Sequence, residues 1–554
     1  MRNPNYASEV LSSLMASASL ISSGMNLGYS ATALPLLDLQ NEDDESWFAS
    51  IASVTTPVGC LVAGPLLDFL GRRYTLTAVN APFLLGWLVL CLTPDASYLW
   101  LLYIGRVLTG LGTGMVAIPA TVYIAEMSTC RMRPMLLTWP PIAISVGILI
   151  VYLLGWQLQN WRLVAGVSIV APVITSTVVF VCLHESPVWL LGSGRDQDAE
   201  SSFRWVRGIA PDQQLSDTLR QEFDAIRSTA LRGATGLTNR KTKLADGVDI
   251  PVDHRAELNT SLKNSELPVG VNDSTPKNTE HSTQVTNTFL VDSQHPAWED
   301  SPMSEHPAGV DCEITDDSCH HGRLAMFARP EVWKPLLILN LYFFFMQMSG
   351  VYVVIFYAVD IIRTVVDDID AFEGSVYLGI LQLIASFAGS YALNRCGRRL
   401  MSLFSGLLMT FCMFGLGLYL ELSTGSNLSF ISLVLILIYI GATAAGFNTI
   451  PWAMLGELFP VRVTGVAGGL TTCLSYSFSF AATKLYPSFV HLLGGSGGVF
   501  FLYGAVSGIA TIYLFFFLPE TFGKTLQQIG DEFVSSHSGV HSCCCSKSLD
   551  FESA

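Results

Sequence analysis

Long apolar runs separated by short polar segments dominate the chain, and each run is about as long as a lipid bilayer is thick. A transmembrane helix needs about 20 mainly apolar residues, and such runs occur six times before residue 185 and six times after residue 333. The pattern predicts an all-α membrane protein with twelve transmembrane helices. The predicted spans are 11–37, 47–67, 75–93, 98–126, 134–155, 161–183, 334–363, 373–394, 400–420, 428–456, 464–490 and 498–518.

The first run has two interpretations, a retained membrane span or a removable signal peptide. Met1 to Val10 contains one arginine, and the following run has no small-residue cleavage pattern. A secretory signal would show a basic start and such a cleavage site. We therefore interpret this run as the first span.

Composition supports the membrane assignment and narrows the class of protein. Only 14% of the 554 residues are charged and half are hydrophobic, whereas soluble domains carry about 25% charged residues. The net charge of −15 comes mostly from the central loop, the tail and residues 38–46, and the 12 cysteines show no disulfide spacing. We find no nucleophile with a base, no cofactor motif and no basic patch for nucleic acid. We therefore expect neither an enzyme nor a nucleic-acid-binding protein.

Basic residues in the short loops predict the orientation. Arg72, Arg73, Arg133 and the arginines near position 398 fall in alternate loops on one side, while the opposite loops are acidic or neutral. Lys and Arg in short loops mark the cytoplasmic side, so both termini and the central loop are expected in the cytoplasm. Asn427, in Asn-Leu-Ser, is then an external glycosylation candidate.

Four regions follow from these spans: a six-helix half over 1–183, a cytoplasmic linker over 184–333, a second six-helix half over 334–518 and a cytoplasmic tail over 519–554. The linker contains two short amphipathic segments, and its polar stretch from Gly233 to Gly322 is typical of disorder. Cys312 and "CHHG" at 319–322 contain metal-ligand residue types, but no second cluster of paired ligands accompanies them, so we predict no metal site. Cys543–Cys545 suits thioacylation or stays unmodified.

Three charged motifs occur in both halves in the same order. Gly71-Arg72-Arg73 returns 326 positions later, and Glu126 and Glu185 return as Glu457 and Glu520, 331 and 335 positions later. The near-constant offset predicts two pseudo-symmetric halves in the same orientation, the arrangement of major facilitator transporters. Because a charge at bilayer centre costs about 2.5–3.5 kcal/mol or more, we expect these groups at helix ends.

There the motifs can form salt bridges that open and close the cytoplasmic side, although arginines that only anchor the topology are the alternative. The predicted gating residues are Arg72, Arg73, Glu126, Arg133, Glu185, Arg398, Arg399, Glu457, Arg462 and Glu520. Prolines near Pro451 and at Pro140-Pro141 are expected to let helices bend.

Seven motifs in order resemble the sugar porter family of the major facilitator superfamily, from about Gly28 to Gln527 with the central loop excepted. They are "GPLLDFLGRRY" (64–74), "GRVLTGLGTGM" (105–115), "PATVYIAEMSTCRMRP" (119–134), "HESPVWLLGSGR" (184–195), "QMSGVYVVIFY" (347–357), "IPWAMLGELFP" (450–460) and "PETFGKTLQQI" (519–529). Within the family the chain looks most like facilitative glucose and insect trehalose transporters. The resemblance implies a sugar bound between the halves.

Carried over position by position, the resemblance implies a substrate site on the seventh, eighth, tenth and eleventh helices. Its residues are Gln347, Tyr352, Tyr357, Gln382, Asn448, Trp452, Ser475 and Tyr476. Amides and hydroxyls suit a sugar because they both donate and accept hydrogen bonds. Tyr352 replaces an asparagine of the family pattern and Ser475-Tyr476 an Asn-Trp pair, so the substrate is expected to differ or transport to be weak.

The first span contains no carboxylate between Ser22 and Leu37, where proton-coupled relatives place one. We therefore expect passive facilitation. We also expect the plasma membrane as the location, and a sugar and the lipid bilayer as partners. Two alternatives stay open: a proton-coupled symporter, and a non-transporting nutrient sensor whose loop and tail bind cytoplasmic partners.

Overall fold

The computed structural model describes residues 6–37, 39, 41–129, 132–209, 213, 215–217, 219–228, 330–365, 369–422, 429–459, 464–521 and 533. Every regular element among them is helical. Several predictions lie outside these residues and stay predictions. They concern the segment 233–322, Asn427, Arg462 and Cys543–Cys545.

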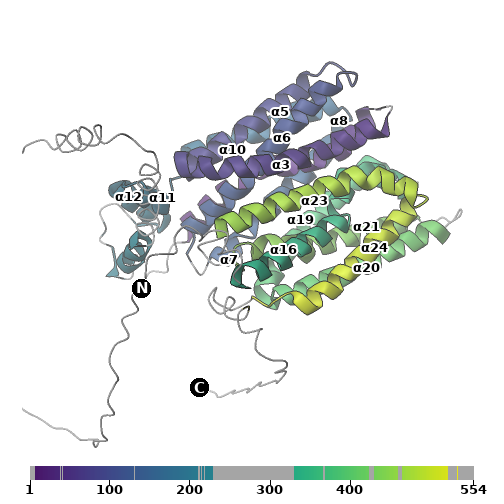
Figure 1. Ribbon diagram of the computed structural model, residues 1–554. Helices are drawn as coiled ribbons and strands as arrows, with labels where there is room; N and C mark the ends of the chain where they lie inside the picture. The colour runs from purple at the N-terminus through teal and green to yellow at the C-terminus, as the bar shows by residue number, and fades with distance from the viewer. Residues whose placement is uncertain are drawn as a thin grey trace, which may run out of the picture. The chain divides into compact units, whose positions relative to one another are not determined.

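The N-terminal half contains six spans, drawn in purple to blue in Figure 1, and all six agree closely with the predicted runs. Several spans consist of two helices in line. The helices are α1 (Ala7–Ala18), α2 (Ile21–Leu37), α3 (Glu42–Leu70), α4 (Arg72–Ala78), α5 (Asn80–Leu92), α6 (Leu99–Met127), α7 (Arg133–Leu136), α8 (Trp139–Leu158), α9 (Trp161–Ser168) and α10 (Val170–Cys182).

The C-terminal half repeats this arrangement, in green to yellow (Figure 1). Its helices are α16 (Pro330–Met348), α17 (Val351–Phe356), α18 (Ala358–Val365), α19 (Ala371–Cys396), α20 (Arg398–Leu422), α21 (Ser429–Ala442), the π-helix η1 (Thr443–Phe447), α22 (Thr449–Met454), α23 (Thr464–Leu492) and α24 (Ser496–Phe517).

Eleven spans in the described part of the chain are long and apolar enough to cross a membrane. The twelfth predicted span, α23, has the length at 29 residues but carries several hydroxyl side chains together with Lys484 and His491. Its polar character makes it a helix that needs protein partners along its length.

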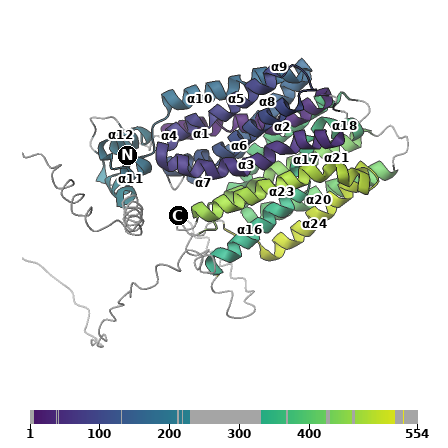
Figure 2. The same ribbon diagram turned by 45° about the horizontal axis from the view of Figure 1, so that its top comes forward.

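Small residues let the helices pack closely within each half. A Cβ atom at Gly114 of α6 would lie 1.9 Å from the backbone oxygen of Thr56 in α3, so only glycine permits this approach. Contacts between α3 and α23 and between α8 and α19 connect the halves. Figures 1 and 2 show α3 and α23 side by side, and α17 and α18 also contact α2 (Figure 2).

The predicted amphipathic segments of the linker are helical. They form α12 (Asp196–Val206) and a helical stretch over 219–228, and another short helix, α11 (Pro187–Gly192), precedes them. Asp196 and Asp198 lie in the first turn of α12 and Arg204 in its last, where they complement the helix dipole.

Candidate functional site

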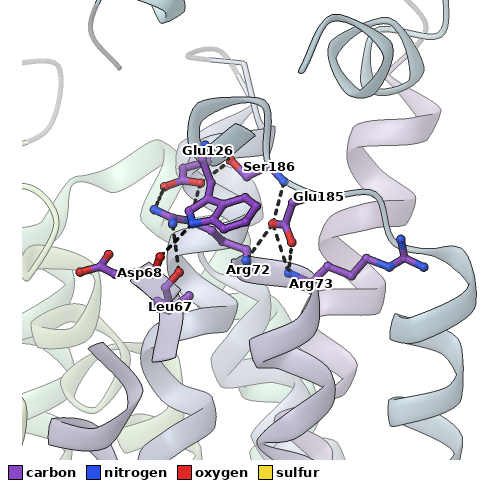
Figure 3. A network of polar contacts seen from close by, with 8 residues as sticks. Leu67, Asp68, Arg72, Arg73, Glu126, Glu185 and Ser186 are labelled. Atoms are coloured by element: carbon purple, nitrogen blue, oxygen red, sulfur yellow. Dashed lines mark hydrogen bonds and ion pairs between the residues drawn. The ribbon is translucent and has the colours of Figure 1, made fainter. Parts of the chain in front are cut away.

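The first charge cluster lies where α3, α4, α6 and the loop after α10 meet (Figure 3). The Arg72 guanidinium binds Glu126 through two bonds, Nη2 to Oε1 at 2.7 Å and Nε to Oε2 at 2.9 Å. The Glu185 carboxylate accepts the backbone N–H groups of Arg72 at 2.7 Å and Arg73 at 3.1 Å, and the Ser186 hydroxyl donates to Glu126. We call these five residues the N-terminal latch.

A second cluster repeats this geometry in the other half. Arg398 binds Glu457 through Nη2 at 2.6 Å and Nε at 3.1 Å. The Glu520 carboxylate accepts the backbone N–H groups of Arg398 at 3.0 Å and Arg399 at 3.1 Å, and the Thr521 hydroxyl donates to Glu457 at 2.7 Å. These five residues form the C-terminal latch, and we call the end of the helices that carries both clusters the latch end.

The same backbone turn explains the glycine before each arginine pair. Gly71 and Gly397 have φ angles of +86° and +82°, a region that side chains disfavour. A Cβ atom would lie 2.6 Å from an oxygen of Glu185 and 2.8 Å from one of Glu520. The glycine of each Gly-Arg-Arg motif is therefore needed for the carboxylate to reach the two N–H groups that follow it.

Each latch joins helices of a single half. Among the described residues, no ion pair crosses between the halves at the latch end. Arg133 departs from the prediction that it pairs with Glu126 or Glu185, because its guanidinium donates instead to the backbone oxygen of Ser128 at 3.3 Å. Arg133 follows the loop after α6, which brings it within reach of that carbonyl group.

The loop that carries Glu185 also contacts the linker. The His184 ring stacks on Trp205 of α12, with ring centroids 4.1 Å apart. Burial and the nearby Arg73 lower the pKa of His184. Burial raises the pKa of Glu185, while the N–H groups of Ser186, Arg72 and Arg73 act in the opposite direction.

Broken helices hold the predicted substrate residues. The seventh span is interrupted at Gly350, whose φ of +87° separates α16 from α17. The tenth span contains η1 directly before Asn448 and Pro451, and π-helical turns are frequent at functional sites. The fifth span also breaks, between α7 and α8, just before Pro140. The predicted helix breaks near the prolines are therefore present.

Two pairs of predicted site residues are in contact. The Gln347 side chain of α16 donates to the Ser475 hydroxyl of α23 at 3.1 Å. The Trp452 and Tyr476 rings lie 5.7 Å apart, and Phe343 of α16 packs against Trp452 at 4.8 Å. The seventh, tenth and eleventh spans thus present one amide, one hydroxyl and an aromatic surface.

Several polar atoms of these residues are buried without a hydrogen-bond partner in the described part of the chain. They are Gln347 Oε1, Asn448 Oδ1, the Tyr357 hydroxyl and, on α23, the Ser479 hydroxyl. Buried polar groups are normally paired, so unpaired ones in a transmembrane half are suited to a polar ligand.

No hydrogen bond links the other predicted residues to the Gln347–Ser475 pair among the described residues. Tyr357 packs on Tyr486, with ring centroids 4.8 Å apart, and Tyr352 packs on Phe356 of its own helix. Gln382 is buried in α19, and its backbone oxygen accepts the hydroxyl of Ser386, which also bonds Ser145 of α8 in the other half at 2.9 Å.

Sequence reasoning missed a buried polar cluster in the N-terminal half. Arg106 of α6 is fully buried, and its guanidinium donates to Asn26 Oδ1 at 2.6 Å, Ser30 Oγ at 2.6 Å and the Phe48 backbone oxygen at 3.2 Å. Asn26 also donates to Thr113 at 2.9 Å. An arginine in the middle of a predicted span was the available signal.

Sequence comparisons with known proteins identify a family and several relatives. Residues 13–245 and 304–533 match the family described as "Sugar (and other) transporter". The facilitated trehalose transporter Tret1 of Apis mellifera ligustica is 24% identical, over 96% of this chain and 89% of that protein. The facilitated glucose transporter member 8 of solute carrier family 2 from Mus musculus is 26% identical, over 96% of both chains.

A solved structure supports the fold. The proton:xylose symporter XylE, of the major facilitator superfamily, superposes with a TM-score of 0.68 at 18% identity, over 95% of this chain and all of that chain. The family match covers both six-helix halves, and each half carries one of the repeated latches. These findings all indicate the same fold. This protein is therefore a multi-pass membrane protein of the sugar (and other) transporter family, with the twelve-helix major facilitator fold.

Proposed function

We propose that this protein carries a sugar, a hexose or a trehalose-like disaccharide, across a membrane by facilitated diffusion. The two halves rock around the substrate site, which opens to one side at a time. The observation that carries the proposal is that Gln347 Oε1 and Asn448 Oδ1 are buried without a hydrogen-bond partner in the described part of the chain. The spans that hold them, and the neighbouring α23, also carry the packed rings of Trp452 and Tyr476. Sugar hydroxyls supply the missing partners, and the relatives are named as trehalose and glucose transporters.

The Arg106 cluster supports passive transport. The guanidinium faces the neutral amide of Asn26 and the hydroxyl of Ser30, and α2 contains no Asp or Glu. A proton-coupled carrier needs a titratable group that changes charge during the cycle, and buried carboxylates are the usual choice. Asn26 cannot titrate in this role.

Uptake into proteoliposomes tests the proposal directly. Purified protein is reconstituted and offered labelled hexoses, disaccharides and polyols. We expect saturable uptake of at least one sugar, and we expect Gln347→Ala to abolish it. Gln157→Ala is the matched control, because this glutamine is exposed on α8 and lies outside the site.

Two outcomes separate the alternatives. Sugar binding without uptake would favour a sensor over a transporter. Uptake that responds to an imposed gradient between about pH 5.5 and 7.5 would favour a proton-coupled symporter. We further place the protein in the plasma membrane with both termini in the cytoplasm, an orientation supported by the basic residues of the latch end.

A further inference from the structure

A lysine lies inside one of the membrane-spanning helices. Lys484 is near the C-terminal end of α23, and its side chain is only 21% exposed. A cation at this depth is unfavourable unless it is paired, and such residues commonly mark functional sites. Lys484 is not one of the predicted substrate residues, and no hydrogen bond links it to Gln347 or Trp452 among the described residues.

All the described contacts of the Lys484 ammonium come from α3, which belongs to the other half. Nζ donates to Ser46 Oγ at 2.7 Å, and it lies 3.4 Å from the Asp43 backbone oxygen and 3.5 Å from Asp43 Oδ1. It also lies 4.6 Å from the centre of the Trp47 ring, a favourable cation–π position. Ser46 is fixed in turn, because its hydroxyl donates to the Asp43 backbone oxygen at 2.9 Å.

Other contacts between the halves surround this lysine. His491 Nε2 lies 2.6 Å from Glu42 Oε2, and the rings of Trp47 and Phe480 are 5.9 Å apart. Lys484, His491 and the first residues of α3 line a pocket of about 510 Å³. We call this end, which carries Glu42–Glu45, the acidic end. Ion pairs cross between the halves here, whereas both latches stay within one half.

We propose that Lys484 is a gating residue that holds the acidic end closed by binding α3. This rests on the proposed alternating access, which requires α3 and α23 to separate when the acidic end opens. Separation removes every described partner of Lys484 at once. The lysine therefore stabilises the closed arrangement selectively, and a residue that favours one state shifts the population towards it.

Spin-label distances test the gate without any substrate. Labels at Asp95→Cys and Leu492→Cys, both exposed and on opposite halves at the acidic end, are placed in the full chain after its native cysteines are replaced. Pulsed EPR then measures the short and long distances in lipid. Lys484→Met keeps the length of the side chain and removes the charge, and we expect it to raise the ratio of long to short distances about tenfold.

Asp44→Asn is the matched control. It removes one charge from the same turn of α3, but Asp44 accepts its hydrogen bonds from Tyr103 and Asn41 of the same half, each at 3.1 Å. We expect no shift for this variant. An unchanged distance ratio in Lys484→Met, or an equal shift in Asp44→Asn, overturns the proposal. If Lys484→Met does not fold, Ser46→Ala is the second test of the proposal. It removes the hydroxyl that accepts the 2.7 Å hydrogen bond from Lys484, and it should shift the distance ratio in the same direction.

Transport kinetics separate gating from structural damage. Because an open acidic end exposes the site more often to that side, Lys484→Met should lower the half-saturation concentration measured from that side and raise it from the other. A damaged protein would lose maximal rate in both directions instead, which contradicts a gating role. A shift in the distance ratio without any sugar uptake would support the gating role of Lys484 and contradict the proposed sugar substrate.

Discussion

Arginine is required in the latches because its planar guanidinium reaches two carboxylate oxygens at once. Arg72 does so with Glu126 while its backbone N–H reaches Glu185. A lysine carries the same charge but offers a single point of contact. The side chains of Arg72 and Glu126 are 14% and 15% exposed, so solvent weakens the pair only in part.

We therefore expect Arg72→Lys to lower the free energy of unfolding by about 1.5–3 kcal/mol and to slow uptake several-fold. Thermal unfolding and initial uptake rates measure both effects. Arg195→Lys is the control, because Arg195 pairs with Asp198 on the surface, where each side chain is 55% exposed. Equal losses in the two variants would contradict a special role for the latch.

The sequence predicts some of these residues and not others, for a physical reason. Arg72 and Glu126 can be predicted from the sequence because their motifs recur as Arg398 and Glu457. The role of Lys484 cannot be predicted in this way, because its partners lie in α3, more than 400 positions away, and no short-range sequence pattern connects them. The candidate substrate site can be predicted only in part. The resemblance identifies Gln347 and Ser475, but only the folded chain shows that they form a hydrogen bond with each other.

For the helices too, the sequence predicts features that depend on a local pattern better than features that depend on distant contacts. The hydrophobic runs predict the spans because a bilayer requires a fixed apolar length. The interruptions are harder to predict, since η1 depends on packing between spans, where the Ser405 hydroxyl donates to the Ala442 backbone oxygen and accepts the Phe447 N–H. The break at Gly350 is equally hard to predict, because Gly112 and Gly114 also lie in an apolar run and α6 continues through them.

Gly350→Ala should damage the seventh span. The φ angle of +87° disfavours alanine by about 1–2 kcal/mol, and the new Cβ atom would lie 2.4 Å from the Tyr503 ring. We expect a lower melting temperature and little uptake. Gly469→Ala in α23 is the matched control, since no atom lies within 4 Å of its new Cβ. A normal melting temperature for Gly350→Ala would show that the bend is not required.

The contact between linker and latch should depend on pH. Because the pKa of His184 is lowered by burial and Arg73, the folded state favours the neutral ring. Its contribution to stability is therefore present above the usual imidazole pKa of about 6.5 and lost as the pH falls. Thermal unfolding at about pH 7.5 and 5.5 measures this loss, and His184→Phe, which keeps an aromatic ring on Trp205, should lose less. An identical loss in both proteins would exclude His184 as its source.

The orientation of the complete transporter is testable at one residue. If both termini face the cytoplasm, Asn427 faces outward and accepts a glycan. Expression in a glycosylating eukaryotic cell should give a band that glycosidase shifts, and Asn427→Gln should remove the shift. Asn259→Gln is the control, because Asn259-Thr-Ser261 matches the same motif but lies in the predicted cytoplasmic loop. A shift that depends on Asn259 would reverse the orientation.

We propose that both halves act together in one carrier, because the proposed substrate residues Gln347 and Ser475 lie in one half and the Arg106 cluster lies in the other. Tyr152 of α8 donates to the Ile355 backbone oxygen across the junction at 2.8 Å, and α3 contacts α23. A single site that faces one side at a time predicts exchange of substrate across the membrane without an energy source.

Counterflow in proteoliposomes measures this exchange. Vesicles loaded with unlabelled sugar are diluted into a trace of the same labelled sugar, with no pH gradient. The proposed function predicts that the label first rises above its equilibrium level inside and then declines, and that Gln347→Ala removes this overshoot. A steady approach to equilibrium would indicate a pore, and no entry of label for any sugar in the panel would contradict the assignment as a sugar carrier.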